Sequence, residues 1–193
     1  RRIVFVDGFF SKELSSKDLV TNTGLKVLSL EEAARGNFPF VSHHLARYAR
    51  YDDNSFATLN TAFTRDGGVI LVPARQVEET PVHILYVSTA ARENVMTNPR
   101  TLVIAQAGSR LKVLEHFATL GAAQVLTNVV TEIVVEEDAV VEHCKIQEES
   151  ARAFHVATIQ MQQGRSSNLL SHSISIGAAL TRNTITCGLD GEH

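Results

Sequence analysis

Three short runs decide the fold of this chain: Val113-Leu114-Glu115-His116, Val140-Val141-Glu142-His143 and Leu169-Leu170-Ser171-His172. In each run one residue separates an apolar pair from a histidine, and the three histidines follow one another at nearly equal spacing. A long repeat of this kind is typical of solenoids, in which one turn cannot bury its apolar face without its neighbours. The three histidines are therefore expected on adjacent parallel strands of one sheet.

A second series of runs interleaves with the first and has nearly the same period. Its runs begin at Thr101, Asn128, His155 and Asn183, again at nearly equal spacing. Two residues after each of these positions stands an apolar residue, and these four are expected to form a column on a second sheet: Val103, Val130, Ala157 and Ile185. Two interleaved series with one period predict a parallel β-helix with at least two strands per turn and turns roughly 4.8 Å apart. The alternative is a β-sandwich with accidental regularity.

The predicted secondary structure divides the chain into two parts. Residues 1–54 are expected to form a small α+β segment, with a strand over 3–6, a turn at Asp7-Gly8, and helix-like patches at 30–35 and 42–51. Residues 55–193 are expected to form an all-β core, because no convincing helical period follows residue 55. Its strands are placed near residues 69–73, 82–88, 101–106, 111–117, 127–135, 139–146, 154–162, 168–176 and 182–189. We expect this core to be truncated at its C-terminal end.

Composition excludes several classes of partner and of fold. The 193 residues carry a net charge of −3, and the isoelectric point is near 6.3, so neither nucleic acid nor an anionic membrane is expected as a partner. No apolar run approaches the roughly 20 residues of a membrane span. Two cysteines without CxxC spacing build neither a disulfide framework nor a zinc ribbon, which favours a reducing compartment.

The histidine column of His116, His143 and His172 is the first candidate for chemistry. Stacked imidazoles can share an iron or zinc ion, whereas a ladder of like side chains also arises simply from stacked repeats. Whether the column has a metal role stays open at this point. Glu115 and Glu142 are expected to point to the opposite side of their strands from the histidines.

The remaining candidates are cysteines and acidic runs, and each has a plain structural interpretation. Cys187 falls in an apolar column and is expected in the core, while Cys144 is expected to face away from its neighbour His143. The acidic runs at 136–138 and 148–149 are expected to be solvated turns. There is no nucleophile, zinc or phosphate-loop motif. The sequence therefore assigns no catalytic, cofactor-binding or metal-binding residue.

A set of longer motifs is spread over almost the whole chain. They are Val4-Phe5-Val6-Asp7-Gly8, Asn54–Phe63, Asp66–Pro73, Asn98-Pro99-Arg100, Arg110–His116, Ser171-His172-Ser173, Gly177–Asn183 and Leu189–Glu192. Together these motifs resemble the SufB/SufD family of iron–sulfur cluster assembly proteins. Two further runs, Gln147–Ser150 and Ala153–Thr158, resemble the SufD branch of that family in particular.

This resemblance implies a right-handed parallel β-helix and a scaffold role without enzymatic activity. A SufD-type subunit pairs with SufB, binds the SufC ATPase and is linked to iron supply. The complex, rather than this segment, then handles iron and the iron–sulfur cluster. The location would be the cytoplasm of a bacterium, or the plastid stroma of a plant or alga. The SufC-binding helices and a functional histidine of the family lie beyond the Leu189–Glu192 region, so no site residue is carried over, and His193 is not equated with that histidine.

Two alternatives to a SufD-type scaffold remain open on the sequence. One is a SufB-type subunit that carries the cluster. The other is an enzyme, either a β-helical carbohydrate-active enzyme such as a polysaccharide lyase, or a cupin-like oxygenase. A lyase would need Asp, Lys and Arg clustered along one ladder, whereas the ladders here carry Val, Ile, His and Asn.

Overall fold

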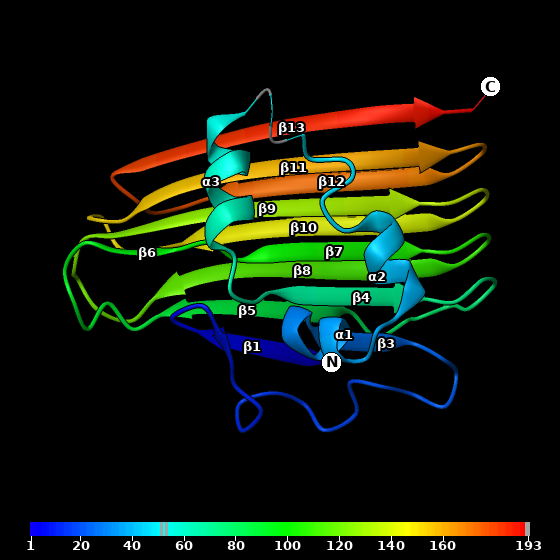
Figure 1. Ribbon diagram of the computed structural model, residues 1–193, viewed down its shortest axis with the longest axis horizontal. Helices are drawn as coiled ribbons and strands as arrows, with labels where there is room; N and C mark the ends of the chain where they lie inside the picture. Colours follow the sequence, from blue (N-terminus) through cyan, green and yellow to red (C-terminus); the bar gives the residue numbers. More distant parts are fainter. Residues whose placement is uncertain (51, 53, 192–193) are drawn as a thin grey trace.

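The computed structural model describes residues 1–50, 52 and 54–191, and these residues form two sheets stacked face to face (Figure 1). Sheet A has the strand order β12-β10-β8-β5-β1-β2, and sheet B has the order β13-β11-β9-β7-β4-β3, with β6 also paired to β9. From β7 onward, successive strands alternate between the sheets, and from β4 onward the paired strands within each sheet are parallel. The expected parallel β-helix is confirmed.

The strands of sheet A are β1 (Arg2–Val6), β2 (Phe9–Phe10), β5 (Val82–Ser88), β8 (Arg110–Thr119), β10 (Val140–Glu148) and β12 (Asn168–Ser175). The strands of sheet B are β3 (Lys26–Ser29), β4 (Gly68–Val72), β6 (Val95–Thr97), β7 (Arg100–Ala105), β9 (Val125–Val135), β11 (Phe154–Gly164) and β13 (Leu180–Asp190). Helices α1 (Leu30–Arg35), α2 (Pro39–His44) and α3 (Ser55–Phe63) lie over sheet B (Figure 1).

The burial of each sheet explains its sequence pattern. Sheet B is covered on both faces, by sheet A and by the helices, so a strand such as β7 is buried at every position. Parallel strands covered on both faces read as continuous apolar runs. Sheet A packs on the interior with one face only, and β5 therefore alternates between buried and half-buried residues. The interior between the two sheets is the main apolar core.

The register differs from the one that a constant period predicts. His116, His143 and His172 do lie on the adjacent strands β8, β10 and β12, as expected. However, His143 pairs with Val113 and Ser171, so the three imidazoles do not form one ladder.

The second column shows the same effect on sheet B. Val103 pairs with Ile133, Ile133 with Met161, and Met161 with Cys187, and each of these steps along the chain is shorter than the one before. Val130, Ala157 and Ile185 lie on the expected adjacent strands but outside the column of Val103. Because successive turns shorten, a pattern of nearly constant spacing slips out of register.

The expected elements of the N-terminal segment are present with shifted bounds, and strand β3 is an additional element that was not predicted. Strands β1 and β2 form the hairpin around Asp7-Gly8, and β1 also pairs in parallel with β5, which makes it part of sheet A. Helix α1 lies at the expected place and begins with a capping box between Ser29 and Glu32. The patch expected at 42–51 is helical only through His44, because the backbone becomes extended at Leu45. The helix α2 begins earlier than expected, at Pro39. Tyr51, at the end of that patch, lies outside the described residues.

The expectation of no helix after residue 55 is wrong, because α3 occupies Ser55–Phe63. Asn54 caps this helix by accepting hydrogen bonds from the backbone N–H groups of Phe56 and Ala57. Polar side chains, rather than an apolar stripe, dock α3 on sheet B: Asn60 Nδ2 donates to the carbonyl oxygens of Pro99 and Asn128 at 2.9 and 2.8 Å. The end of the expected core, residues 192–193, lies outside the described residues.

A buried carboxylate holds the segment after α2 on the outer face of sheet B. Glu132 of β9 accepts hydrogen bonds from the backbone N–H groups of Ala46, Tyr48 and Ala49 at 2.9, 2.8 and 3.0 Å. Arg100 of β7 donates to the same carboxylate from Nε and Nη2 at 3.1 and 2.9 Å. Both side chains are almost inaccessible to water, and each charge is compensated by the other and by hydrogen bonds.

None of the described helices is long and apolar enough to cross a membrane.

Candidate functional site

Part of the interior between the sheets is polar, and it brings together ionisable groups that the sequence analysis had not placed side by side. On sheet A, alternation points Glu115 of β8 and His143 and Lys145 of β10 inward. On sheet B, His155 at the start of β11 also points inward. Glu149, directly after β10, completes the set, and all five are buried.

Glu115 and His143 form the first buried pair. His143 Nε2 donates to Glu115 Oε2 at 2.9 Å, and Thr131 Oγ1 donates to the same oxygen at 3.0 Å. Burial by itself would raise the pKa of Glu115, but the hydrogen bond and charge of His143, with the Thr101 and Thr131 hydroxyls, hold that pKa below its ordinary value. Ser171 Oγ lies 3.1 Å from His143 Nδ1, so both ring nitrogens of this buried imidazole have partners.

Glu149 and His155 form the second buried pair. His155 Nδ1 donates to Glu149 Oε2 at 2.7 Å, Gln147 Nε2 donates to the same oxygen at 3.2 Å, and the Thr127 hydroxyl donates to the other. Burial opposes ionisation of Glu149, but these donors keep its pKa below the ordinary value. Burial also lowers the pKa of His155, which favours a neutral imidazole that donates from Nδ1. No described group hydrogen-bonds to His155 Nε2.

Lys145 lies between the two pairs. It is the direct neighbour of Glu115 in the β8–β10 register, its Nζ donates to Asn183 Oδ1 at 3.0 Å, and its ammonium lies 5.5 Å from the centre of the Phe117 ring. Burial lowers the pKa of Lys145 to about 8, against the opposing charges of Glu115 and Glu149. We call this space between the sheets the lumen, and it thus holds a lysine whose charged form is disfavoured by burial.

The histidines of the predicted column separate into different environments. His143 points into the lumen, whereas His116 points outward, where its Nε2 lies 3.0 Å from Glu148 and its ring stacks on His83 at 5.7 Å. His172 is exposed. No group of three or more His, Cys, Asp or Glu side chains within the described ranges is placed to hold a metal ion together.

Two predictions about single residues are wrong, and two are confirmed. Cys187 is exposed rather than in the core, because it lies on the outermost strand of sheet B, β13. Glu149 is buried and paired, so the run at 148–149 is not simply a solvated turn. Cys144 does face away from His143, since only the histidine is buried. The run at 136–138 follows β9 in a turn, as expected.

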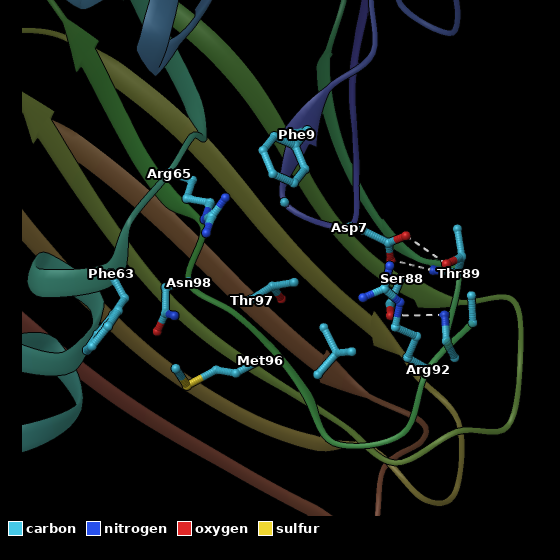
Figure 2. Close-up of a pocket in the computed structure, with 14 residues that line it drawn as sticks. Asp7, Phe9, Phe63, Arg65, Ser88, Thr89, Arg92, Met96, Thr97 and Asn98 are labelled. Atoms are coloured by element: carbon cyan, nitrogen blue, oxygen red, sulfur yellow. Dashed lines mark hydrogen bonds between the residues drawn. The ribbon is translucent and has the colours of Figure 1, made fainter.

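A pocket of about 470 Å³ lies beside the hairpin β1–β2, where four segments of the chain meet (Figure 2). The hairpin contributes Asp7 to Phe9, and the end of α3 with the residues after it contributes Phe63 and Arg65. The end of β5 and the connection to β6 contribute residues 88–92, and β6 with its following residue contributes 95–98. This pocket is not predictable from the sequence, because no single segment carries a motif for it.

The fold and the lumen define a class: a two-sheet parallel β-helix with ionisable groups enclosed between the sheets and the described helices over one sheet. Residues 86–193 match the core domain of the SufBD proteins of the SUF iron–sulfur cluster assembly system, and residues 1–84 match the SufBD N-terminal region. The chain belongs to the SufBD family.

Curated relatives agree with this assignment. An iron–sulfur cluster assembly SufBD family protein of Synechocystis sp. is 28% identical over 95% of this chain and 42% of its own length. Proteins of the same description from Staphylococcus haemolyticus and Staphylococcus aureus are 28% and 27% identical, each over 94% of this chain and 37% of the relative. The chain therefore spans about two fifths of the length of these relatives. Their shared description does not separate SufD from SufB.

Proposed function

We propose that this chain is part of a SufD-type scaffold subunit, which pairs with a SufB subunit and binds the SufC ATPase during iron–sulfur cluster assembly. The subunit contributes to iron supply and has no catalytic activity of its own. The segment described here binds no cofactor, and the iron and the cluster are cargo of the whole complex. The complex works in the bacterial cytoplasm, or in the plastid stroma if the source is a plant or alga.

The observation that carries this proposal is the match of both halves of the chain to the two regions of the SufBD family. The geometry is compatible with a scaffold, because a stack of parallel strands forms a long body, and none of the described helices covers the outer face of sheet A (Figure 1). Such a face offers area for partner subunits without a motion of the fold.

The assignment to the SufD branch is supported by the local role of two motifs. Gln147–Ser150 and Ala153–Thr158, the runs that resemble SufD, flank the turn between β10 and β11. Gln147, Glu149 and His155 within them form one buried hydrogen-bonded group. These side chains support one another across the lumen, so we interpret the motifs as a structural signature of the branch.

The direct test is co-expression of the whole subunit that contains this chain with SufB and SufC from one Suf system. We expect a complex of all three subunits in native mass spectrometry, in which this chain occupies the place of SufD. Parallel co-expression with SufC and SufD, without SufB, separates the two branches. A complex that forms only in this second combination would assign the chain to the SufB branch, and a chain that stays alone in both would contradict the scaffold role.

A further inference from the structure

The pocket in Figure 2 has walls of exposed aromatic rings, and this is its first unexplained property. Phe9 from the hairpin is 54% exposed and Phe63 at the end of α3 is 58% exposed. Met96 adds a third exposed apolar side chain from β6. Large apolar side chains that line one hollow and remain open to water mark a surface suited to an apolar or aromatic ligand.

The second property is an excess of unpaired positive charge. Arg65 and Arg92 both line the pocket, and neither has an ion-pair partner among residues 1–50, 52 and 54–191. The Arg65 guanidinium lies 5.6 Å from the centre of the Phe9 ring, so cation and aromatic surface are presented side by side. Asp7 is the acidic residue of the lining, and Thr89 already donates to both of its carboxylate oxygens, at 2.8 and 2.7 Å.

The third property is a rigid frame. The two hydrogen bonds from Thr89 to Asp7 tie the tip of the hairpin to the β5–β6 connection. Asp7 and Ala90 have φ angles of 51° and 50°, and Gly8 has 85°, so both connections contain tight turns in left-handed conformations. A pocket with fixed walls loses little conformational freedom when a ligand binds.

We propose that this pocket binds a small planar aromatic anion, for which a nucleoside monophosphate is the simplest example. The aromatic base stacks on the phenyl rings, and the phosphate accepts hydrogen bonds from the unpaired guanidinium groups, which bind phosphate in a bidentate manner. The volume falls within the ~300–1,000 Å³ typical of small-molecule sites. This site is separate from the scaffold role and does not depend on it.

The test measures binding of AMP to the full-length chain by ligand-observed NMR and by isothermal titration calorimetry. Adenosine and inorganic phosphate serve as the two half-ligands, because each offers only one of the two recognised groups. The variants are Arg65→Gln, Arg92→Gln and Phe63→Ala, all in the lining of the pocket, with folding checked by circular dichroism. Arg182→Gln is the matched control, because Arg182 also lies over a phenyl ring, that of Phe56 at 5.8 Å, but outside this pocket.

The site predicts that AMP binds more tightly than either half-ligand. Arg65→Gln and Arg92→Gln should each weaken AMP binding roughly tenfold, as expected for loss of a charged hydrogen-bond donor. Phe63→Ala should weaken AMP and adenosine alike and leave phosphate unchanged, whereas Arg182→Gln should change nothing. The proposal is overturned if AMP binds no better than phosphate, if the pocket variants bind AMP as the parent does, or if Arg182→Gln is equally impaired.

Discussion

Replacement of Glu132 by glutamine is expected to release the segment of residues 45–50 from sheet B. The carboxylate is fully buried and accepts five hydrogen bonds, three from backbone N–H groups and two from Arg100. A glutamine has one acceptor oxygen where the carboxylate has two, so at least two of these donors lose their partner. Arg100 is then left buried beside a neutral side chain.

The expected loss in the free energy of unfolding follows from this geometry. Breaking a buried ion pair by removal of one partner costs about 3–5 kcal/mol, because the other charge stays uncompensated. This is a large part of the ~5–15 kcal/mol by which a domain is stable. Urea unfolding followed by circular dichroism measures the loss, and a cycle with Arg100→Met measures the coupling between the two side chains. We expect the double variant to be less destabilised than the sum of the single variants.

Hydrogen exchange provides the local test of the same prediction. In Glu132→Gln the amides of Ala46, Tyr48 and Ala49 should exchange faster, since the carboxylate that accepts from all three is gone, while amides in α1 should keep their rates. A loss below about 1 kcal/mol, the low end for an unmade buried hydrogen bond, or unchanged exchange at these three amides, would refute the view that Glu132 holds this segment.

Three further predictions concern the lumen and the packing of the turns. Burial lowers the pKa of Lys145 from 10.5 to about 8, so the unfolded chain binds more protons between these values and stability should rise with pH across that window. Lys145→Met should abolish this rise, and an unchanged slope would contradict the burial of the ammonium. Glu149→Gln should cost about 2–4 kcal/mol in urea unfolding, because His155 and two other donors lose a charged acceptor; a cost under about 0.5 kcal/mol would show that the group is not paired in solution. Gly67→Ala should lower the free energy of unfolding by about 3 kcal/mol or more, because a Cβ at residue 67 would overlap the backbone of Arg100. In Gly108→Ala the new Cβ would lie 3.6 Å from its nearest neighbour, so the cost should be only the ~1–2 kcal/mol of the left-handed φ of 67°. Equal costs for the two variants would contradict the close approach of Gly67 to Arg100.

The fold is predictable because two simple periods are both present in the sequence. Alternation within a strand identifies runs such as 111–117, and the recurrence of histidine-containing runs identifies which strands lie side by side. The exact register is not predictable, because it depends on the length of each turn. The steps from Val103 to Ile133, Met161 and Cys187 on sheet B shorten progressively, and a near-constant spacing in the sequence conceals this change.

Helix α3 was not predicted from the sequence, for a different physical reason. Its docking rests on Asn60 and Asn128, whose amides bond to backbone carbonyls, and its apolar periodicity is weak. A pattern search weights apolar positions and does not detect this kind of contact. The cap at Asn54 is the signal that the sequence offers.

The buried ionisable pairs could not be predicted from the sequence, because the partners are distant from each other along the chain. Glu115 and His116 are neighbours in the chain but point to opposite sides of β8, and the partner of Glu115 is His143, one turn later. The acidic run at 148–149 suggests a solvated turn, although Glu149 pairs with His155 across that turn. Such pairs follow from the register, so they become visible only when the register is known.

The most direct test of the central claim, a SufD-type scaffold, is complementation in a bacterium that depends on its Suf system. The whole subunit that contains this chain is expressed in strains that lack either SufD or SufB, and the activity of an iron–sulfur enzyme is measured in each. We expect activity to return in the strain without SufD and to stay absent in the strain without SufB. Rescue of the strain without SufB alone would contradict a SufD-type role.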